Sequence, residues 1–142
     1  MGREEKGRVF GVDYGDVRTG IAISDEGRIL ASGIATLKEN GMVKTAERVA
    51  QEATSRGAAL IVVGLPRNMN GSEGPRADVI RAFVGYLERA TSIPIVLWDE
   101  RLTTAEAHRI LSASEVGSRK RRKVVDTLAA EIILQSYLDA HR

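Results

Sequence analysis

The sequence contains no cysteine among its 142 residues. This absence excludes a disulfide framework, a thiolate metal site and a cysteine nucleophile. Neither of its two histidines, His108 and His141, lies near a plausible nucleophile elbow, so we exclude a serine triad and assign neither histidine a role. No long apolar run follows the charged residues at the start of the chain. We therefore expect no secretory signal, no membrane span and a cytoplasmic location.

The chain also has little net charge, +2 at neutral pH, and this value alone does not indicate a nucleic-acid partner. The distribution of charge is more informative, because five cations occupy consecutive positions whereas the acidic residues are scattered. This basic run consists of Arg119, Lys120, Arg121, Arg122 and Lys123. Such a run is either a solvated loop or a surface that contacts nucleic acid.

Composition and hydrophobic patterning indicate one α/β domain over residues 1–142, because 43% of the residues are hydrophobic and the length suits a single core. Strands are expected over residues 8–13, 17–24, 28–37, 58–64 and 93–98. Helices are expected over residues 42–56, from 75 to about 87, 103–113 and 123–140, with a polar, basic loop over 114–122. The order βββαβαβαα predicts a mixed five-stranded sheet with helices packed on it.

The residue that ends the first expected strand is Asp13, and Gly15 behind it supplies a tight turn. A carboxylate at the end of a buried strand costs free energy of folding unless it contacts a metal ion, a basic side chain or a hydrogen-bond donor. Two interpretations are open at this point. Either Asp13 caps the turn through its own side chain, or it binds a metal ion.

Two further acidic positions lie at the same edge of the sheet as Asp13 if the first, fourth and fifth strands lie side by side. Glu100, or its neighbour Asp99, follows the last strand, and Asp126 lies in the first turn of the last expected helix. Strand alternation allows only one of Asp99 and Glu100 to face Asp13. Converging carboxylates suit hard divalent ions, Mg²⁺ or Mn²⁺, and two such ions can promote phosphodiester hydrolysis. Alternatively, Asp99 and Glu100 only precede a helix and Asp126 only favours the helix dipole.

The segment VDYGDVRTGIA, residues 12–22, resembles the signature of the YqgF/RuvX family, a bacterial branch of the ribonuclease H-like superfamily. Further similarities follow in family order and cover nearly the whole chain: VGLP at 63–66, NG at 70–71, WDERLTT at 98–104 and VDTLAA at 125–130. The resemblance implies a ribonuclease H-like fold and a metal-dependent nuclease site of Asp13, Glu100 and Asp126. It implies two activities, maturation of the 5′ end of 16S ribosomal RNA, which we expect to be the main one, and Holliday junction resolution in DNA recombination and repair.

Cations near this edge are expected to hold the phosphates of the substrate without reading its sequence. The residues concerned are Arg18, Arg67, Arg101 and the basic run. Backbone amides of residues 68–74, before a helix N-terminus, are expected to hold a second phosphate. The protein is expected to be a monomer or a homodimer, the dimer matching the two-fold symmetry of a junction.

Two other classes of function fit parts of the pattern. The actin and sugar-kinase ATPases begin with a similar Asp-x-Gly hairpin, but they clamp nucleotide between two such units and this length provides one. A catalytically silent nucleic-acid-binding module is the second alternative. Divalent-metal binding that depends on the acidic residues would distinguish a nuclease from such a module.

Overall fold

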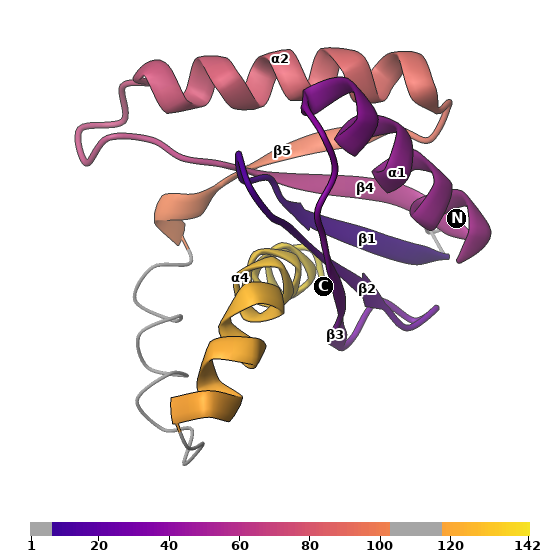
Figure 1. Cartoon of the computed structure of the whole chain (residues 1–142). Helices are drawn as coiled ribbons and strands as arrows, with labels where there is room; N and C mark the ends of the chain where they lie inside the picture. Colours follow the sequence, from indigo (N-terminus) through magenta and orange to yellow (C-terminus); the bar gives the residue numbers. More distant parts are fainter. Residues whose placement is uncertain (1–6, 103–117) are drawn as a thin grey trace.

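The computed structural model describes residues 7–102 and 118–142, and for residue 102 and residues 118–126 it describes the backbone alone. A five-stranded sheet of order β3-β2-β1-β4-β5 forms its centre (Figure 1). The strands are β1 (Arg8–Asp13), β2 (Thr19–Ser24), β3 (Ala31–Leu37), β4 (Ala58–Leu65) and β5 (Ile95–Asp99). β1, β2 and β3 pair antiparallel, whereas β1, β4 and β5 run parallel. The predicted mixed sheet is therefore confirmed.

Helices cover both faces of the sheet. α1 (Met42–Ser55) and α2 (Pro75–Ala90) lie on one face, and α4 (Ser118–Ala140) crosses the other (Figure 1). A single 3-10 turn, η1 (Glu100–Leu102), follows β5. α2 begins with proline in its first turn, where the missing N–H group costs no helical hydrogen bond. None of the helices within the described ranges has the length and apolarity needed to cross a bilayer.

Two hydrophobic cores result from this arrangement, and strand alternation assigns side chains to them. Phe10 and Val12 of β1 pack toward α1 and α2, whereas Val9 packs toward α4. At Gly11 the helix comes so close that an added Cβ would lie 2.8 Å from Cβ of Leu134. α4 thus rests directly on β1, the strand that ends in Asp13.

The central parallel strand, β4, is buried on both of its faces. Ile61 and Val63 belong to the core under α1 and α2, and Leu60 and Val62 contact the core under α4. This confirms the expectation from the continuous apolar run at this point of the sequence. It also places β1, β4 and β5 side by side, as the candidate site requires.

Several boundaries differ from those expected. β2 begins at Thr19 because the preceding residues form the turn, where Val17 is 70% exposed. β3 begins only at Ala31 because the Asp25 carboxylate accepts hydrogen bonds from backbone N–H groups of residues 27, 29 and 30 and holds them in a loop. β5 extends from Ile95 to Asp99.

The largest difference concerns the basic run. α4 begins at Ser118, so the prediction of a loop is wrong for residues 118–122, and the run belongs to the first turns of the helix. Lysine and arginine are good helix formers, and no proline or glycine stands between Ser118 and the rest of α4 to stop the helix. The expected helix 103–113 and loop residues 114–117 lie outside the described residues. The extent of the domain over residues 1–142 stays a prediction.

Candidate active site

The candidate site lies at the edge where the three parallel strands end. β1 ends with Asp13, and Glu100 directly follows β5. Between them stands Gly64 of β4, which pairs with Trp98 and follows Val63, the partner of Val12. Because side chains alternate along a strand, Asp13, Gly64 and Glu100 occupy the face that α4 covers.

Gly64 leaves room for the Glu100 side chain to pass over β4. A Cβ built at this position would lie 2.7 Å from Glu100 Oε2 and 3.1 Å from its Cγ. It would also lie 2.6 Å from Ile133 Cδ1 of α4, so there is no space for any larger residue. The Glu100 carboxylate therefore lies above the middle strand, on the side of β5 that faces β1 and Asp13.

The pKa values of both carboxylates are raised, and the charge of Asp13 contributes to the shift of Glu100. Burial raises the pKa of Glu100, and the negative charge of Asp13 raises it further, to about 7, against the opposing effect of Arg76. Burial also raises the pKa of Asp13, and Arg76 opposes this shift. Two half-buried acids whose charges repel form a site that favours a cation or a proton.

Asp13 does not behave as a turn cap in this structure. Among the contacts of the described residues, its carboxylate accepts no backbone hydrogen bond. Asp25 shows what a capping aspartate looks like here, because its oxygens accept from the N–H groups of Gly27, Ile29 and Leu30 at 2.8–3.1 Å. These bonds lower the pKa of Asp25, whereas the pKa of Asp13 is raised.

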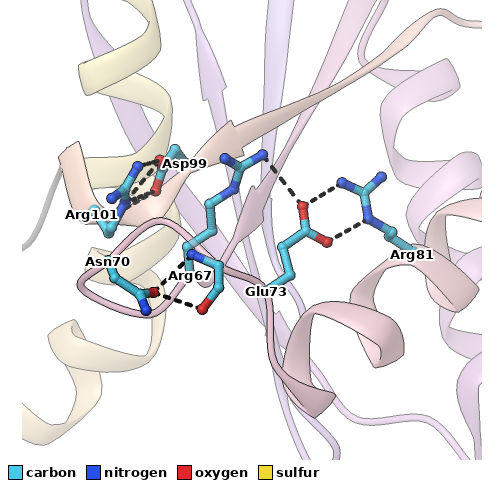
Figure 2. A network of polar contacts seen from close by, with 7 residues as sticks. Arg67, Asn70, Glu73, Arg81, Asp99 and Arg101 are labelled. Atoms are coloured by element: carbon cyan, nitrogen blue, oxygen red, sulfur yellow. Dashed lines mark hydrogen bonds and ion pairs between the residues drawn. The ribbon is translucent and has the colours of Figure 1, made fainter.

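The neighbouring acid, Asp99, has a different partner. Arg101 binds it through Nε and Nη2, the latter at 2.7 Å from Oδ2, and the Arg101 backbone N–H donates to Oδ1 (Figure 2). The hydrogen bond from Arg101 is the main reason why the pKa of Asp99 is lowered. Asp99 is thus an ionised acid paired with Arg101, and its charge also raises the pKa of Glu100, after the larger effects of burial and of Asp13. Glu100 is the acid on which the charge of Asp13 acts, as strand alternation allows.

The loop between β4 and α2 is held by a second set of polar contacts. Arg81 of α2 binds both oxygens of Glu73 at 2.7 and 2.9 Å, and Arg67 lies 3.4 Å from one of them (Figure 2). Arg101 Nη1 donates to the carbonyl oxygen of Met69, which ties this loop to the end of β5. Arg67 and Arg101, two of the expected phosphate contacts, are therefore exposed but already paired with acids.

The same loop was expected to offer its backbone amides to a phosphate. Three of these amides instead donate within the loop: Asn68 N–H to Ser72 O, Gly71 N–H to Asn68 O and Ser72 N–H to Asn70 Oδ1. These bonds shape the loop, but they leave the expected phosphate site without three of its donors.

The other predicted residues are placed as follows. Arg18 is exposed in the turn between β1 and β2. Asp126 occupies a position of α4 one helical turn before Ala130, whose carbonyl oxygen lies close to Gly11 of β1. The side chains of Asp126 and of the basic run lie outside the described part of the chain. Their roles stay predictions.

One residue at this edge was not predicted from the sequence. Arg76, in the first turn of α2, donates from Nη1 to Asp16 Oδ1 and from Nη2 to the carbonyl oxygen of Tyr14, both at 2.9 Å. Its guanidinium also lies over the Tyr14 ring, 5.7 Å from the ring centroid. Its position in the sequence could have predicted this placement, because Arg76 stands at the start of a helix that follows a parallel strand. Such a helix begins at the edge of the sheet where the parallel strands have their carboxyl ends, here called the carboxyl edge.

The residues present fit a hard divalent cation. Asp13 and Glu100 offer carboxylate oxygens, and their mutual repulsion would be relieved by Mg²⁺ or Mn²⁺. Among the described side chains no group of three or more acids, histidines or cysteines is close enough to hold a metal ion. The described side chains therefore contribute this pair of carboxylates to the candidate metal site, and a third protein ligand is not among them.

Replacing Gly64 by alanine is expected to displace Glu100 and to lower any metal-dependent activity about 10- to 100-fold, as when a metal ligand loses its support. The added methyl group would overlap Glu100 or Ile133, and we expect it to destabilise the fold by about 1–3 kcal/mol. Gly85→Ala in α2 is the matched control, since a Cβ there meets nothing within 4 Å. Rate and melting temperature are measured for both variants. Wild-type activity in Gly64→Ala would show that the position of Glu100 does not matter.

Comparison with known proteins gives consistent results. The family model described as "RuvX: Holliday junction resolvase" matches residues 7–140. A relative from Thermoanaerobacter pseudethanolicus named "Putative pre-16S rRNA nuclease" is 46% identical over 136 residues, covering 95% of this chain and 98% of its own length. A relative of the same name from Rhodopseudomonas palustris is 47% identical over 134 residues, covering 94% of this chain and 84% of its own length.

Solved structures resemble the chain in fold. A fowlpox virus resolvase in complex with Holliday junction DNA has a TM-score of 0.53 at 14% identity, covering 94% of this chain and 98% of its own. Thermus thermophilus RuvC with a Holliday junction substrate has a TM-score of 0.54 at 12% identity, covering 94% and 96%. These similarities confirm the ribonuclease H-like fold.

Proposed function

Because the chain belongs to the RuvX family, we propose that it is a metal-dependent endonuclease that hydrolyses phosphodiester bonds and that its main role is maturation of the 5′ end of pre-16S rRNA. The names of the curated relatives support the substrate. The observation that carries the chemistry is the coupled pair of Asp13 and Glu100 at the carboxyl edge of the parallel strands. The cytoplasmic location and the oligomeric state stay predictions.

In this proposal Asp13, Glu100 and Asp126 hold two Mg²⁺ or Mn²⁺ ions. When bound, such ions supply a nucleophilic water at neutral pH and stabilise the charge on the leaving oxygen. Asp13 and Glu100 contribute as ionised ligands, and Gly64 keeps the space in which Glu100 reaches over β4. The position of Asp126, one turn before the part of α4 that touches β1, supports its assignment as the third ligand.

Substrate phosphates are held by cations around the edge in the same proposal. The basic run opens the helix that carries Asp126, so its charges lie close in sequence to the proposed metal ligands. Arg18 is exposed in the turn that follows Asp13. Arg67 and Arg101 would have to exchange Glu73 and Asp99 for a phosphate, so we expect them to contribute less than the basic run.

Replacing all five residues of the basic run by alanine is expected to weaken binding about equally for different nucleic-acid sequences. The slope of log affinity against log salt concentration should flatten by roughly one for each phosphate that the variant no longer neutralises. The cleavage rate of bound substrate should fall less than affinity, since the acidic residues stay in place. An unchanged salt slope would mean that the run is only a solvated start of α4.

Holliday junction resolution is the second candidate function, supported by the description of the family model. A cleavage panel with a pre-16S rRNA fragment, a four-way DNA junction and duplex DNA, each with Mg²⁺ or Mn²⁺, tests both functions. Preferred cleavage of the rRNA fragment supports the proposal, and preferred cleavage of the junction favours the second candidate. Nucleic-acid binding without any cleavage, together with no acid-dependent affinity for Mn²⁺, would favour a catalytically silent module.

A further inference from the structure

Arg76 has a firmly placed guanidinium at the carboxyl edge. One of its two terminal nitrogens donates to the backbone carbonyl of Tyr14, and the group lies over the Tyr14 ring. That ring is itself fixed, since it is buried and stacks on Phe83 with 4.4 Å between ring centroids. The guanidinium is therefore held in place by contacts that do not involve a charged partner.

The charged partner of Arg76 is held much less firmly. Asp16 accepts a single hydrogen bond from the guanidinium, from Nη1 to Oδ1, and its side chain is 74% exposed. By comparison, Glu73, which pairs with Arg81 and Arg67, is 29% exposed, and Asp99, which pairs with Arg101, is 19% exposed. Exposed ion pairs contribute little free energy. Asp16 is accordingly the acid of the three that a competing anion displaces most easily.

The position of Arg76 relative to the proposed site is favourable for an anion. Its positive charge acts on both Asp13 and Glu100, lowering the pKa of each against the raising effect of burial. A guanidinium carries five N–H donors, of which the contacts to Asp16 and Tyr14 involve two nitrogens. It can therefore bind phosphate oxygens while the bond to Tyr14 is kept.

We propose, resting on the nuclease function above, that Arg76 binds a backbone phosphate of the nucleic acid at the carboxyl edge and that Asp16 occupies its guanidinium until the substrate displaces it. Arg76 is thus a substrate-binding residue, and Asp16 is an internal competitor of the substrate. The alternative is purely structural: Asp16 and Arg76 together tether the turn after β1. The two roles predict opposite signs for removal of the Asp16 charge.

The test is a double-mutant cycle of Asp16→Asn and Arg76→Ala. Affinity for a labelled pre-16S rRNA fragment and for a four-way DNA junction is measured over a salt series in EDTA, so that binding is observed without cleavage. We expect Asp16→Asn to raise affinity about 3- to 10-fold, and Arg76→Ala to lower it about 5- to 20-fold with a salt slope flatter by about one. In the Arg76→Ala background, Asp16→Asn should have only the small effect of a general charge change.

Matched controls separate this local effect from overall charge. Asp78→Asn removes an exposed acid from the same turn of α2, and Arg89→Ala removes an exposed cation from the far end of that helix. Both should change affinity less than twofold. Melting temperatures identify variants that lose the fold, and Arg76→Lys, which keeps the charge, should restore part of the affinity in a folded protein.

Three results would overturn the inference: a loss of affinity in Asp16→Asn, an equal gain in the Arg76→Ala background, or an unchanged salt slope in Arg76→Ala. Failure of the proposed function has a different signature. In that case the wild-type protein cleaves none of the nucleic acids with Mg²⁺ or Mn²⁺, while the binding cycle in EDTA still decides whether Arg76 contacts phosphate.

Discussion

Asp13→Asn is expected to abolish cleavage, by about a thousandfold or more, and to leave the metal-free protein at least as stable as the wild type. The loss follows because an amide is a poor ligand for Mg²⁺ or Mn²⁺ in place of an essential carboxylate. Stability should hold or rise because burial disfavours an ionised group at this position, and because the charge of Asp13 raises the pKa of Glu100. Cleavage rate, Mn²⁺ affinity and melting temperature in EDTA are the measurements.

Asp25→Asn is the control for this substitution. The Asp25 carboxylate accepts three backbone hydrogen bonds, which lower its pKa, so neutralising it should lower the melting temperature while cleavage continues. The two aspartates are thus expected to respond in opposite ways. A large drop in melting temperature for Asp13→Asn, with cleavage retained, would identify Asp13 as a turn cap and remove it from the site.

The metal-free protein is expected to lose stability as the pH rises from about 4.5 to about 7. Over this window Glu100, with its pKa raised from 4.5 to about 7, keeps its proton in the folded state and loses it in the unfolded state. The folded state then binds more protons, so the free energy of unfolding falls with rising pH. The raised pKa corresponds to a loss of at most about 3 kcal/mol, and the raised pKa of Asp13 acts in the same direction.

Metal should reverse this trend, because a divalent cation competes with the proton for the same oxygens. Mn²⁺ affinity is therefore expected to rise steeply, up to about tenfold per pH unit, and to level off once the pH is well above the Glu100 pKa of about 7. Urea unfolding in EDTA and calorimetric Mn²⁺ titration at pH 5.5 to 8.5 measure both effects. Glu100→Gln should flatten both pH profiles and abolish cleavage. A pH dependence that Glu100→Gln leaves unchanged would show that another group is responsible.

How far the sequence predicts the fold can be judged from particular elements. The apolar run at residues 60–63 predicts a strand buried on both faces, and β4 is such a strand. Local patterning was sufficient there, because strand burial and period are properties of neighbouring residues. It was insufficient at the start of β3, where Asp25 holds the preceding residues in a loop, and at the start of α4, where basic residues extend the helix.

The candidate site likewise contains residues that the sequence predicts and contacts that it does not. Asp13 and Glu100 could be predicted because both stand where a patterned strand ends, and parallel strands end at one edge of a sheet. The role of Gly64 could not be predicted, because it depends on β4 standing between β1 and β5 and on the path of the Glu100 side chain. The pairing of Arg101 with Asp99, and of Arg67 and Arg81 with Glu73, depends on the conformation of a loop.

The sequence by itself determined which five segments form the sheet, though not where each strand begins, which acids stand at its carboxyl edge and which family the chain resembles. These are local properties, because they depend on the periodicity of hydrophobic residues and on short motifs. Only the tertiary structure decided which cations are already paired with acids, and that Arg76, 60 residues from its partner Asp16, belongs to the same edge. The physical reason is that electrostatic pairing depends on distances in space, and these are set when β1, β4 and α2 pack together.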